Sequence, residues 1–285
     1  MGKSSRFLFI LYIICTSALA YYLKEDAAYL SLVMMGLNML IGLDWTLRVF
    51  SFKRGIVLIL ISFLVTFGLE TLSMKSGIPY GYFRYNLSGP AIGSVPLSVC
   101  FSYFPLITIG WVFGDLAVNS HPVSKSGGPL VRILFAMFTL NVIDLLTAPV
   151  FSLILRLWDY PAGGGFYSIP VTNTLGWMAN TALTLIIFEA SSLRKWIRPQ
   201  NRISKLYCPV SYLLLAQIVP IIICRFALDN RIVSDSTGRG WNLSELYDAL
   251  SLIGLISTGI LFLIGTICWE TYLKKGRQIT YSGNR

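Results

Sequence analysis

Long apolar runs are the feature of this sequence that most constrains its fold. Stretches of about 18–23 residues with few charges alternate with short clusters of charged residues. A helix of that length spans a bilayer, because each residue adds about 1.5 Å and the hydrocarbon core is about 30 Å thick. Only 13% of the 285 residues are charged, about half the usual share in a soluble domain. We therefore predict an all-α, polytopic membrane protein with one integral-membrane domain over residues 1–285.

The apolar runs predict a bundle of about eight transmembrane helices, seven if the first is cleaved. The candidate spans are 6–23, 27–49, 55–72, 94–118, 130–152, 168–190, 206–228 and 246–270. Basic residues precede the first run, which ends in Ala18-Leu19-Ala20, a pattern that also fits a signal peptide. We expect a retained helix, because the chain returns through Lys24-Glu25-Asp26 directly into the second run.

The charge distribution predicts the orientation of the bundle. The net charge is +10, and with alternating spans 16 of the 23 Lys and Arg residues fall on the side of the N-terminus. Positively charged loops stay in the cytoplasm, so both termini are predicted to be cytoplasmic. The basic excess then indicates contact with anionic membrane lipid instead of nucleic acid. We expect a multi-pass protein of the cell membrane if the host is a prokaryote.

Cysteine and histidine usage argues against a metal site. All five cysteines fall inside predicted spans, and none belongs to a Cys-x-x-Cys motif. The single histidine, His121, lies in a predicted cytoplasmic loop with no candidate ligand nearby. A metalloenzyme and an enzyme with a histidine base are therefore both disfavoured.

Two loops on the predicted non-cytoplasmic side are rich in glycine and aromatic residues. One follows Glu70 and ends at Pro96, and the other follows Asp144 and ends at Pro170. Each acid–proline pair is separated by 26 positions, which suggests an internal helix–loop–helix repeat. We expect both prolines to lie in the first turn of the next helix, where a missing N–H costs nothing.

Acidic residues inside the spans are the strongest candidates for chemistry. Glu70 and Asp144 both fall in the non-cytoplasmic half of the membrane, and Asn173 opens a later span on the same side. An ionisable group at that depth is costly and indicates a functional site. The structural alternative is that the two acids pair with Arg84, Arg156 or backbone donors. Three other acids lie near cytoplasmic span ends, where snorkelling or pairing with Arg48, Arg194 or Lys195 explains them: Asp44, Asp115 and Glu189.

Aromatic residues gather in the same two loops. They are Tyr80, Tyr82, Phe83, Tyr85, Trp158, Tyr160, Phe166, Tyr167 and Trp177. An aromatic belt at the membrane surface accounts for many of them. Aromatic faces beside a buried carboxylic acid are also what an enzyme with a carbocation intermediate needs, namely a proton source and π-clouds that stabilise the cation.

The two loops carry a resemblance to a known family. "SGIPYGYFRYN…GPAIGSVPLSV" after a glutamate, and later "WDYPAGGGFYSIPVTNTLGW", resemble the integral-membrane carotenoid biosynthesis proteins that include bisanhydrobacterioruberin hydratase and γ-carotene 1′-hydratase. The match covers mainly residues 66–190. Ser168 and Thr174 depart from the residues that the family often has there, which puts the substrate in doubt more than the fold.

The resemblance implies a cofactor-free hydro-lyase that adds water across the terminal double bond of an acyclic carotenoid. Protonating that alkene requires a carboxylic acid that stays neutral, which burial favours. Asp144 is the candidate general acid, and Glu70 its partner that orients or deprotonates water. Tyr80, Tyr82, Tyr85 and Trp177 are the candidates for the cation end of the pocket, Asn173 for holding the water, and Arg84 and Tyr167 complete the substrate-binding set.

Two other classes of function stay open. A membrane terpenoid cyclase or other isoprenoid enzyme uses the same acid and aromatics with water excluded, although the chain has no DDxxD-like site for a diphosphate and magnesium. A lipid or solute transporter, or a scaffold, is compatible with a repeat, but the two loops lie on one side instead of in inverted topology. Other enzymes of the same pathway are further candidate partners.

Overall fold

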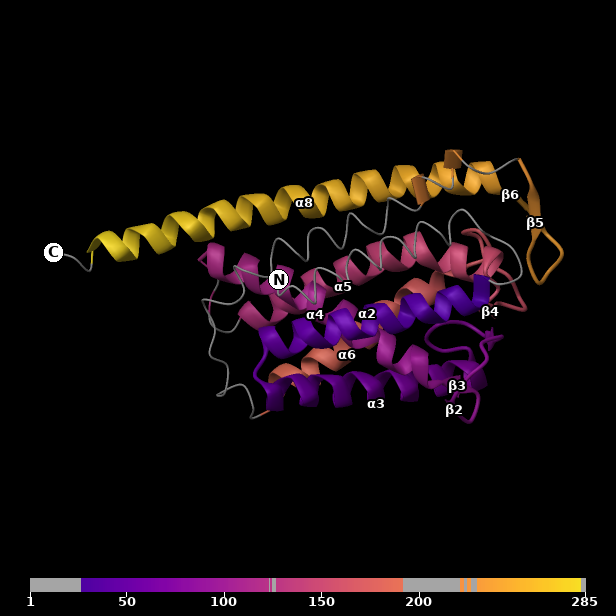
Figure 1. The fold of residues 1–285 in the computed structure, drawn as a ribbon, viewed down its shortest axis with the longest axis horizontal. Helices are drawn as coiled ribbons and strands as arrows, with labels where there is room; N and C mark the ends of the chain where they lie inside the picture. Colours follow the sequence, from indigo (N-terminus) through magenta and orange to yellow (C-terminus); the bar gives the residue numbers. More distant parts are fainter. Residues whose placement is uncertain are drawn as a thin grey trace.

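The computed structural model is almost entirely helical (Figure 1). It describes residues 27–122, 124, 127–191, 221–222, 225–226 and 230–282. The long helices are α2 (Ala27–Val49), α3 (Phe52–Ser76), α4 (Leu97–Ser120), α5 (Gly127–Pro149), α6 (Val171–Ala190) and α8 (Leu243–Ser282). A π-helical segment, Val150–Ile154, continues α5. The predicted first span lies outside the described residues, and so does most of the predicted seventh.

Five of these helices are long and apolar enough to cross a membrane. They cover Phe52–Ser76, Leu97–Ser120, Gly127–Ile154, Val171–Ala190 and Leu243–Lys274, and they coincide within a few residues with five predicted spans. The helix α2 matches the predicted span 27–49. The chain is therefore a multi-pass helical membrane protein, as the apolar runs predicted.

Three small β-structures lie together at one end of the bundle, which we call the loop end (Figure 1). They are formed by β1 (Arg84–Tyr85), β2 (Ala91–Ile92), β3 (Val95–Pro96), β4 (Trp158–Asp159), β5 (Ile232–Ser234) and β6 (Gly240–Asn242). The pairs are β1 with β4, β2 with β3 and β5 with β6, all antiparallel. That this end faces away from the cytoplasm stays a prediction from the charge distribution.

The two loop prolines lie one position earlier than predicted. Pro96 and Pro170 are the residues immediately before α4 and α6, with extended ψ angles of 136° and 149°. The carbonyl of Pro170 accepts the N–H of Asn173 at 2.9 Å. Each proline therefore occupies the N-cap position, with an extended ψ, instead of belonging to the first turn of its helix.

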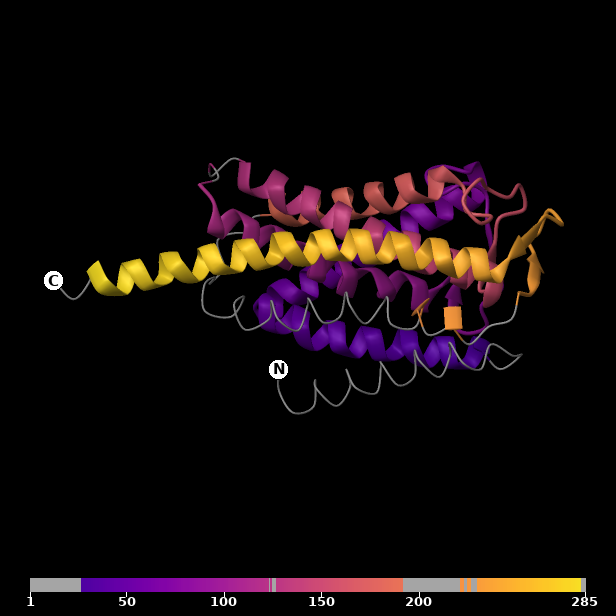
Figure 2. The ribbon, with the colours of Figure 1, turned by 90° about the horizontal axis from the view of Figure 1, so that it is seen from above.

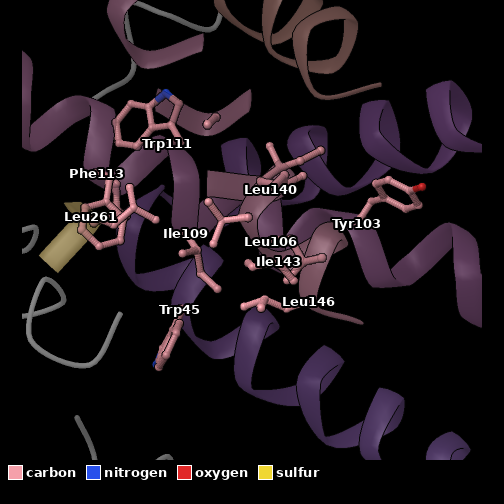
Figure 3. Close-up of a cluster of buried hydrophobic side chains, with 14 of the residues drawn as sticks. Trp45, Tyr103, Leu106, Ile109, Trp111, Phe113, Leu140, Ile143, Leu146 and Leu261 are labelled. Carbon is pink, nitrogen blue, oxygen red and sulfur yellow. The ribbon is translucent and has the colours of Figure 1, made fainter. Parts of the chain in front are cut away.

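The helix α4 forms the centre of the bundle. Of the residues in the apolar stretch of α4, 78% are buried inside the protein. The corresponding share is 28% for α3 and for α8, whose surfaces face largely outward. Apolar side chains from α2, α4, α5 and α8 meet in the core (Figure 3), among them Trp45, Ile109, Leu140 and Leu261. Figures 1 and 2 show α8 along the outside of the bundle and extending past the other helices at the end opposite the loops.

Small residues bring α4 and α5 into backbone contact. A Cβ atom added at Gly110 would lie 2.5 Å from the Cα of Ala136, and one added at Gly114 would lie 2.5 Å from the Cα of Arg132. The Gly110–Gly114 spacing is the small-xxx-small pattern that lets membrane helices approach closely. This contact holds the helix that carries Asp144 against the central helix.

Ion pairs join acidic and basic side chains at the end opposite the loops. Arg132 Nε donates to Asp115 Oδ1 at 2.7 Å, and its Nη1 lies 3.8 Å from Glu189 Oε1. The predicted pairing of Asp44 with Arg48 is confirmed at 2.8 Å. For Asp115 and Glu189 the observed partner is Arg132, which the sequence analysis did not name, while the predicted partners Arg194 and Lys195 lie outside the described residues. Pairing with an arginine therefore accounts for all three acids.

The α4–α5 contact yields a prediction about stability. Gly110→Ala forces Ala136 to move and is expected to destabilise the detergent-solubilised protein by about 1–3 kcal/mol. Gly68→Ala is the matched control, because nothing lies within 4 Å of an added Cβ on that helical glycine and alanine favours helix. Thermal unfolding followed by size-exclusion chromatography measures both. Equal midpoints for the two variants would contradict the close contact.

Candidate active site

A cavity of about 120 Å³ opens under the loop end, among α2, α3, α4, α5 and α6. Two carboxyl groups line it, Glu70 from α3 and Asp144 from α5. Both side chains belong to nearly inaccessible residues, 3% and 1% exposed. No Lys or Arg is found among the described residues of the lining, so neither acid has a compensating cation there. The predicted structural alternative, pairing with Arg84 or Arg156, is not observed.

Glu70 accepts hydrogen bonds from two tyrosines. The hydroxyl of Tyr85 donates to Oε2 at 2.9 Å, and that of Tyr103 donates to Oε1 at 3.4 Å. Burial raises the pKa of the Tyr85 phenol, in the loop, well above its ordinary value, so this phenol stays a donor. Phenol donors on both oxygens stabilise negative charge on this carboxyl group.

Asp144 is held by an amide. The Nδ2 of Asn173 donates to both carboxyl oxygens, at 3.0 and 2.9 Å, and the Oδ1 of Asn173 accepts the hydroxyl of Tyr160 at 2.8 Å. Both ends of the Asn173 side chain are thus engaged by protein groups. This arrangement makes Asn173 an orienting partner of Asp144, whereas the predicted water-holding role requires one of these bonds to open.

Tyr80 anchors the first loop over the helices. Its ring packs where a Cβ on Gly176 would lie, 2.1 Å from Cδ1, so only glycine permits the contact. The Nδ2 of Asn180 donates to the Tyr80 hydroxyl at 2.8 Å and to Thr66 Oγ1 at 3.0 Å. The backbone N–H of Tyr80 donates to Ser73 Oγ at 2.9 Å. Helices α3 and α6 together therefore fix this tyrosine at the cavity wall.

Aromatic rings form about half of the remaining wall. Tyr103 and Trp177 pack with centroids 4.7 Å apart, and the ring of Tyr85 meets those of Phe83 at 5.2 Å and Trp158 at 6.4 Å. The pairing of β1 with β4 places Tyr85 opposite Trp158. The two loops thereby contribute rings to one cavity, which combines π-faces with two carboxyl groups.

The structure brings together some of the predicted site residues and leaves others apart. Those that line the cavity are Glu70, Tyr80, Tyr85, Asp144, Asn173 and Trp177. Tyr82 is 57% exposed, and Arg84 is an exposed partner of Asp159 at 3.0 Å. Both lie outside the lining because side chains alternate in the extended segment, which turns Phe83 and Tyr85 inward.

Tyr167 also lies outside the cavity. Its hydroxyl donates to the carbonyl of Glu245 at 3.2 Å, and its ring packs on Trp241 at 5.2 Å between centroids. Its backbone has a positive φ of 47°. This left-handed turn directs the side chain toward β6 and the start of α8, so Tyr167 connects the loop before α6 to the β5–β6 hairpin.

Several lining residues were not singled out from the sequence. Tyr103 belongs to the middle of an apolar run, and Figure 3 shows its hydroxyl directed away from the apolar cluster. The observed helix bounds place Tyr103 and Glu70 each six residues from the loop end of its helix, whereas the predicted span ends placed them at different depths. The sequence shows Tyr160 only as one of the aromatic residues gathered in the loops, although its hydroxyl donates to Asn173 behind Asp144. Met35 and Asn38 of α2 gave no distinguishing signal.

Comparison with known proteins identifies relatives. A model of the family described as "Carotenoid biosynthesis protein" matches residues 27–233, which extends on both sides of the motif-bearing segment 66–190. Bisanhydrobacterioruberin hydratase from Haloarcula japonica is 27% identical over 152 residues, covering 53% of this chain and 50% of that protein. The chain thus matches about half the length of this relative. No solved structure gives a significant match.

The buried amide behind Tyr80 yields a prediction about stability. Asn180→Ala leaves the Tyr80 and Thr66 hydroxyls without their shared partner and is expected to cost about 1–3 kcal/mol of unfolding free energy. Asn230→Ala, at an exposed position away from this loop, is the control and should change stability by less than about 0.5 kcal/mol. A thermal shift assay in detergent checks both. Indistinguishable variants would mean that the amide network does not anchor the loop.

Proposed function

The chain belongs to the carotenoid biosynthesis protein family, and on that premise we propose that it adds water across the terminal C=C bond of an acyclic polyene. The proposed product is a tertiary alcohol, and the enzyme is a hydro-lyase acting without a cofactor. One observation carries the proposal: two buried carboxyl groups share a cavity walled by aromatic rings, with no cationic side chain in its described lining. The hydratase relative supports the same reaction class.

Asp144 is the proposed general acid. A charged carboxylate buried without a cation is costly, which favours its neutral, proton-bearing form. The O–H bond of Asp144 breaks as a C–H bond forms at the less substituted alkene carbon, leaving a tertiary cation and an Asp144 carboxylate. The amide of Asn173 contacts both carboxyl oxygens, so it can stabilise the charge that develops there.

Glu70 is the proposed base. Its two phenol donors stabilise negative charge on the carboxyl group and so oppose the effect of its burial. The oxygen of a water molecule attacks the cation and forms the C–O bond, while a proton of that water passes to Glu70. The balance is one alkene and one water consumed and one tertiary alcohol formed. The proton then leaves Glu70, and Asp144 regains one.

The size of the cavity suits one end of a polyene. Its volume of about 120 Å³ is below that of an engineered protein cavity of about 150 Å³ that binds benzene. A terminal isoprenoid unit therefore occupies it, while the remainder of the chain extends toward lipid. In this proposal the rings of Tyr103, Trp177 and Tyr85, which line the cavity, stabilise the cation through their π-faces.

The test of the proposed function is expression in a pigment-producing bacterial host supplied with acyclic, lycopene-type carotenoids. Mass analysis of the pigments should reveal a gain of one water per modified end. Asp144→Asn should lower that turnover by at least about 100-fold, since it removes the proton donor. Asp248→Asn is the control, because this acid on α8 has an exposed side chain paired with Arg225.

Each other outcome of that experiment has a definite meaning. A product of unchanged mass would show cyclisation or isomerisation and would replace hydration by the cyclase alternative. Full turnover in Asp144→Asn would remove the central assignment. No change in any polyene would overturn the proposal, and the loop aromatics would then be interpreted as an interfacial belt.

A tyrosine pair tests the assignment of the base. Tyr85→Phe removes the 2.9 Å hydrogen bond to Glu70 while keeping the ring, and should lower kcat by about tenfold with KM nearly unchanged. Tyr82→Phe makes the same chemical change three positions earlier on an exposed ring and should behave like the wild type. Similar kcat values in the two variants would contradict the role of the Tyr85–Glu70 contact.

A further inference from the structure

A second cavity lies beside the acid cavity at the loop end, and its lining is polar. It measures about 200 Å³ and lies between the second loop and the β5–β6 hairpin. Its described lining includes Ser152, Arg156, Asp159, Ser168, Ser234 and Ser236. We call this space the polar chamber. Of the residues that line the acid cavity, Tyr160 also belongs to the described lining of the polar chamber.

The polar chamber runs from the surface toward the interior. Ser234 and Ser236 on the hairpin are exposed, whereas Ser152 and Ser168 on the opposite wall are 7% and 2% exposed. Ser152 belongs to the π-helical segment that continues α5. Hydroxyl groups are thus available both where solvent enters and at the buried floor.

Tyr160 separates the polar chamber from the acid cavity and lines both. On the chamber side, its backbone carbonyl accepts the hydroxyl of Ser236. On the other side, its phenol donates to Asn173, which in turn donates to Asp144. One residue therefore stands between a polar, surface-connected space and the proposed acid.

The two cavities differ in what they can hold. Buried water occupies sites with two to four polar partners, and each water takes about 30 Å³ in the liquid, so the polar chamber has room for several. Apolar cavities of similar size stay dry. The acid cavity, walled by aromatic rings, is suited to the hydrocarbon end and has few polar atoms besides those already engaged.

We propose that the polar chamber holds the reactant water and delivers it past Tyr160 to the cation formed beside Asp144. This inference rests on the proposed hydratase function and adds the source of its second substrate. Water admitted along a defined route reaches the cation from the loop end, while the aromatic wall excludes water elsewhere. Glu70 then takes the proton of the delivered molecule.

The experiment separates protonation of the alkene from capture of water. Membranes containing the enzyme are incubated with lycopene in D₂O buffer, and mass analysis follows both the tertiary alcohol and deuterium in recovered lycopene. Deuterium enters the recovered alkene when the acid donates a deuteron and the cation then returns a proton from the same carbon. The ratio of alcohol to exchanged alkene therefore reports water capture after the cation has formed.

Two variants fill the polar chamber from different walls. Ser236→Leu acts at the exposed rim, and Ser152→Leu acts at the floor. Their matched controls are Ser236→Ala and Ser152→Ala, which lose the same hydroxyl without filling space. We expect the ratio of alcohol to exchanged alkene to fall about tenfold in each leucine variant, with exchange maintained. The fall should be smaller in the alanine variants, which remove one polar partner of the water but leave its space open.

The other outcomes are decisive as well. An unchanged ratio in a leucine variant that retains turnover would overturn the inference. Parallel loss of alcohol and exchange in a leucine variant with an unaltered thermal midpoint would also overturn it, since the chamber would then support the acid instead of the water. Neither alcohol nor exchange in the wild type would instead mean that the proposed function itself has failed.

Discussion

The antiparallel pairing of β1 with β4 is the interaction on which the candidate site depends. It joins loops that follow different helices and places Arg84 opposite Asp159 and Tyr85 opposite Trp158. A ladder this short is weak by itself, so its position comes from packing onto the helices, chiefly through Tyr80 against α6. Because of that register, one loop supplies the donor to Glu70 while the other supplies Tyr160 behind Asp144.

The bundle treats its buried acids differently at its two ends. Opposite the loops, Asp115 and Glu189 share Arg132, and Trp111 Nε1 donates to Glu189 at 2.9 Å. In this cluster the charge of Arg132 compensates the charges of the acids, and the contacts connect α4, α5 and α6. A structural role is enough to account for it. At the loop end, the hydrogen-bond donors to Glu70 and Asp144 among the described residues are all uncharged. Burying an ionisable group without an opposite charge costs folding free energy, and such groups in a membrane protein indicate a functional site.

The helices and both acids followed from the sequence because their signals are local. An apolar run of sufficient length predicts a span, and a carboxyl group inside a span is conspicuous whatever surrounds it. The rest of the site depends on tertiary contacts. Tyr103 is one more aromatic residue in an apolar run, and only the packing of α3 against α4 brings it to Glu70. Tyr82 and Tyr85 are the same residue type in the same loop. Because side chains alternate in direction along the extended segment, Tyr82 faces outward and Tyr85 faces the cavity.

The same acid and aromatic rings serve hydration and cyclisation, so water access decides between the two chemistries. A tertiary cation in a dry cavity reacts with a neighbouring double bond or returns its proton, whereas one that meets water becomes an alcohol. In this chain aromatic rings line the acid cavity, and Tyr160 is the residue that its described lining shares with that of the polar chamber. Tyr160 would then be the point of discrimination, since the same side chain orients Asp144 through Asn173 and borders the proposed water supply.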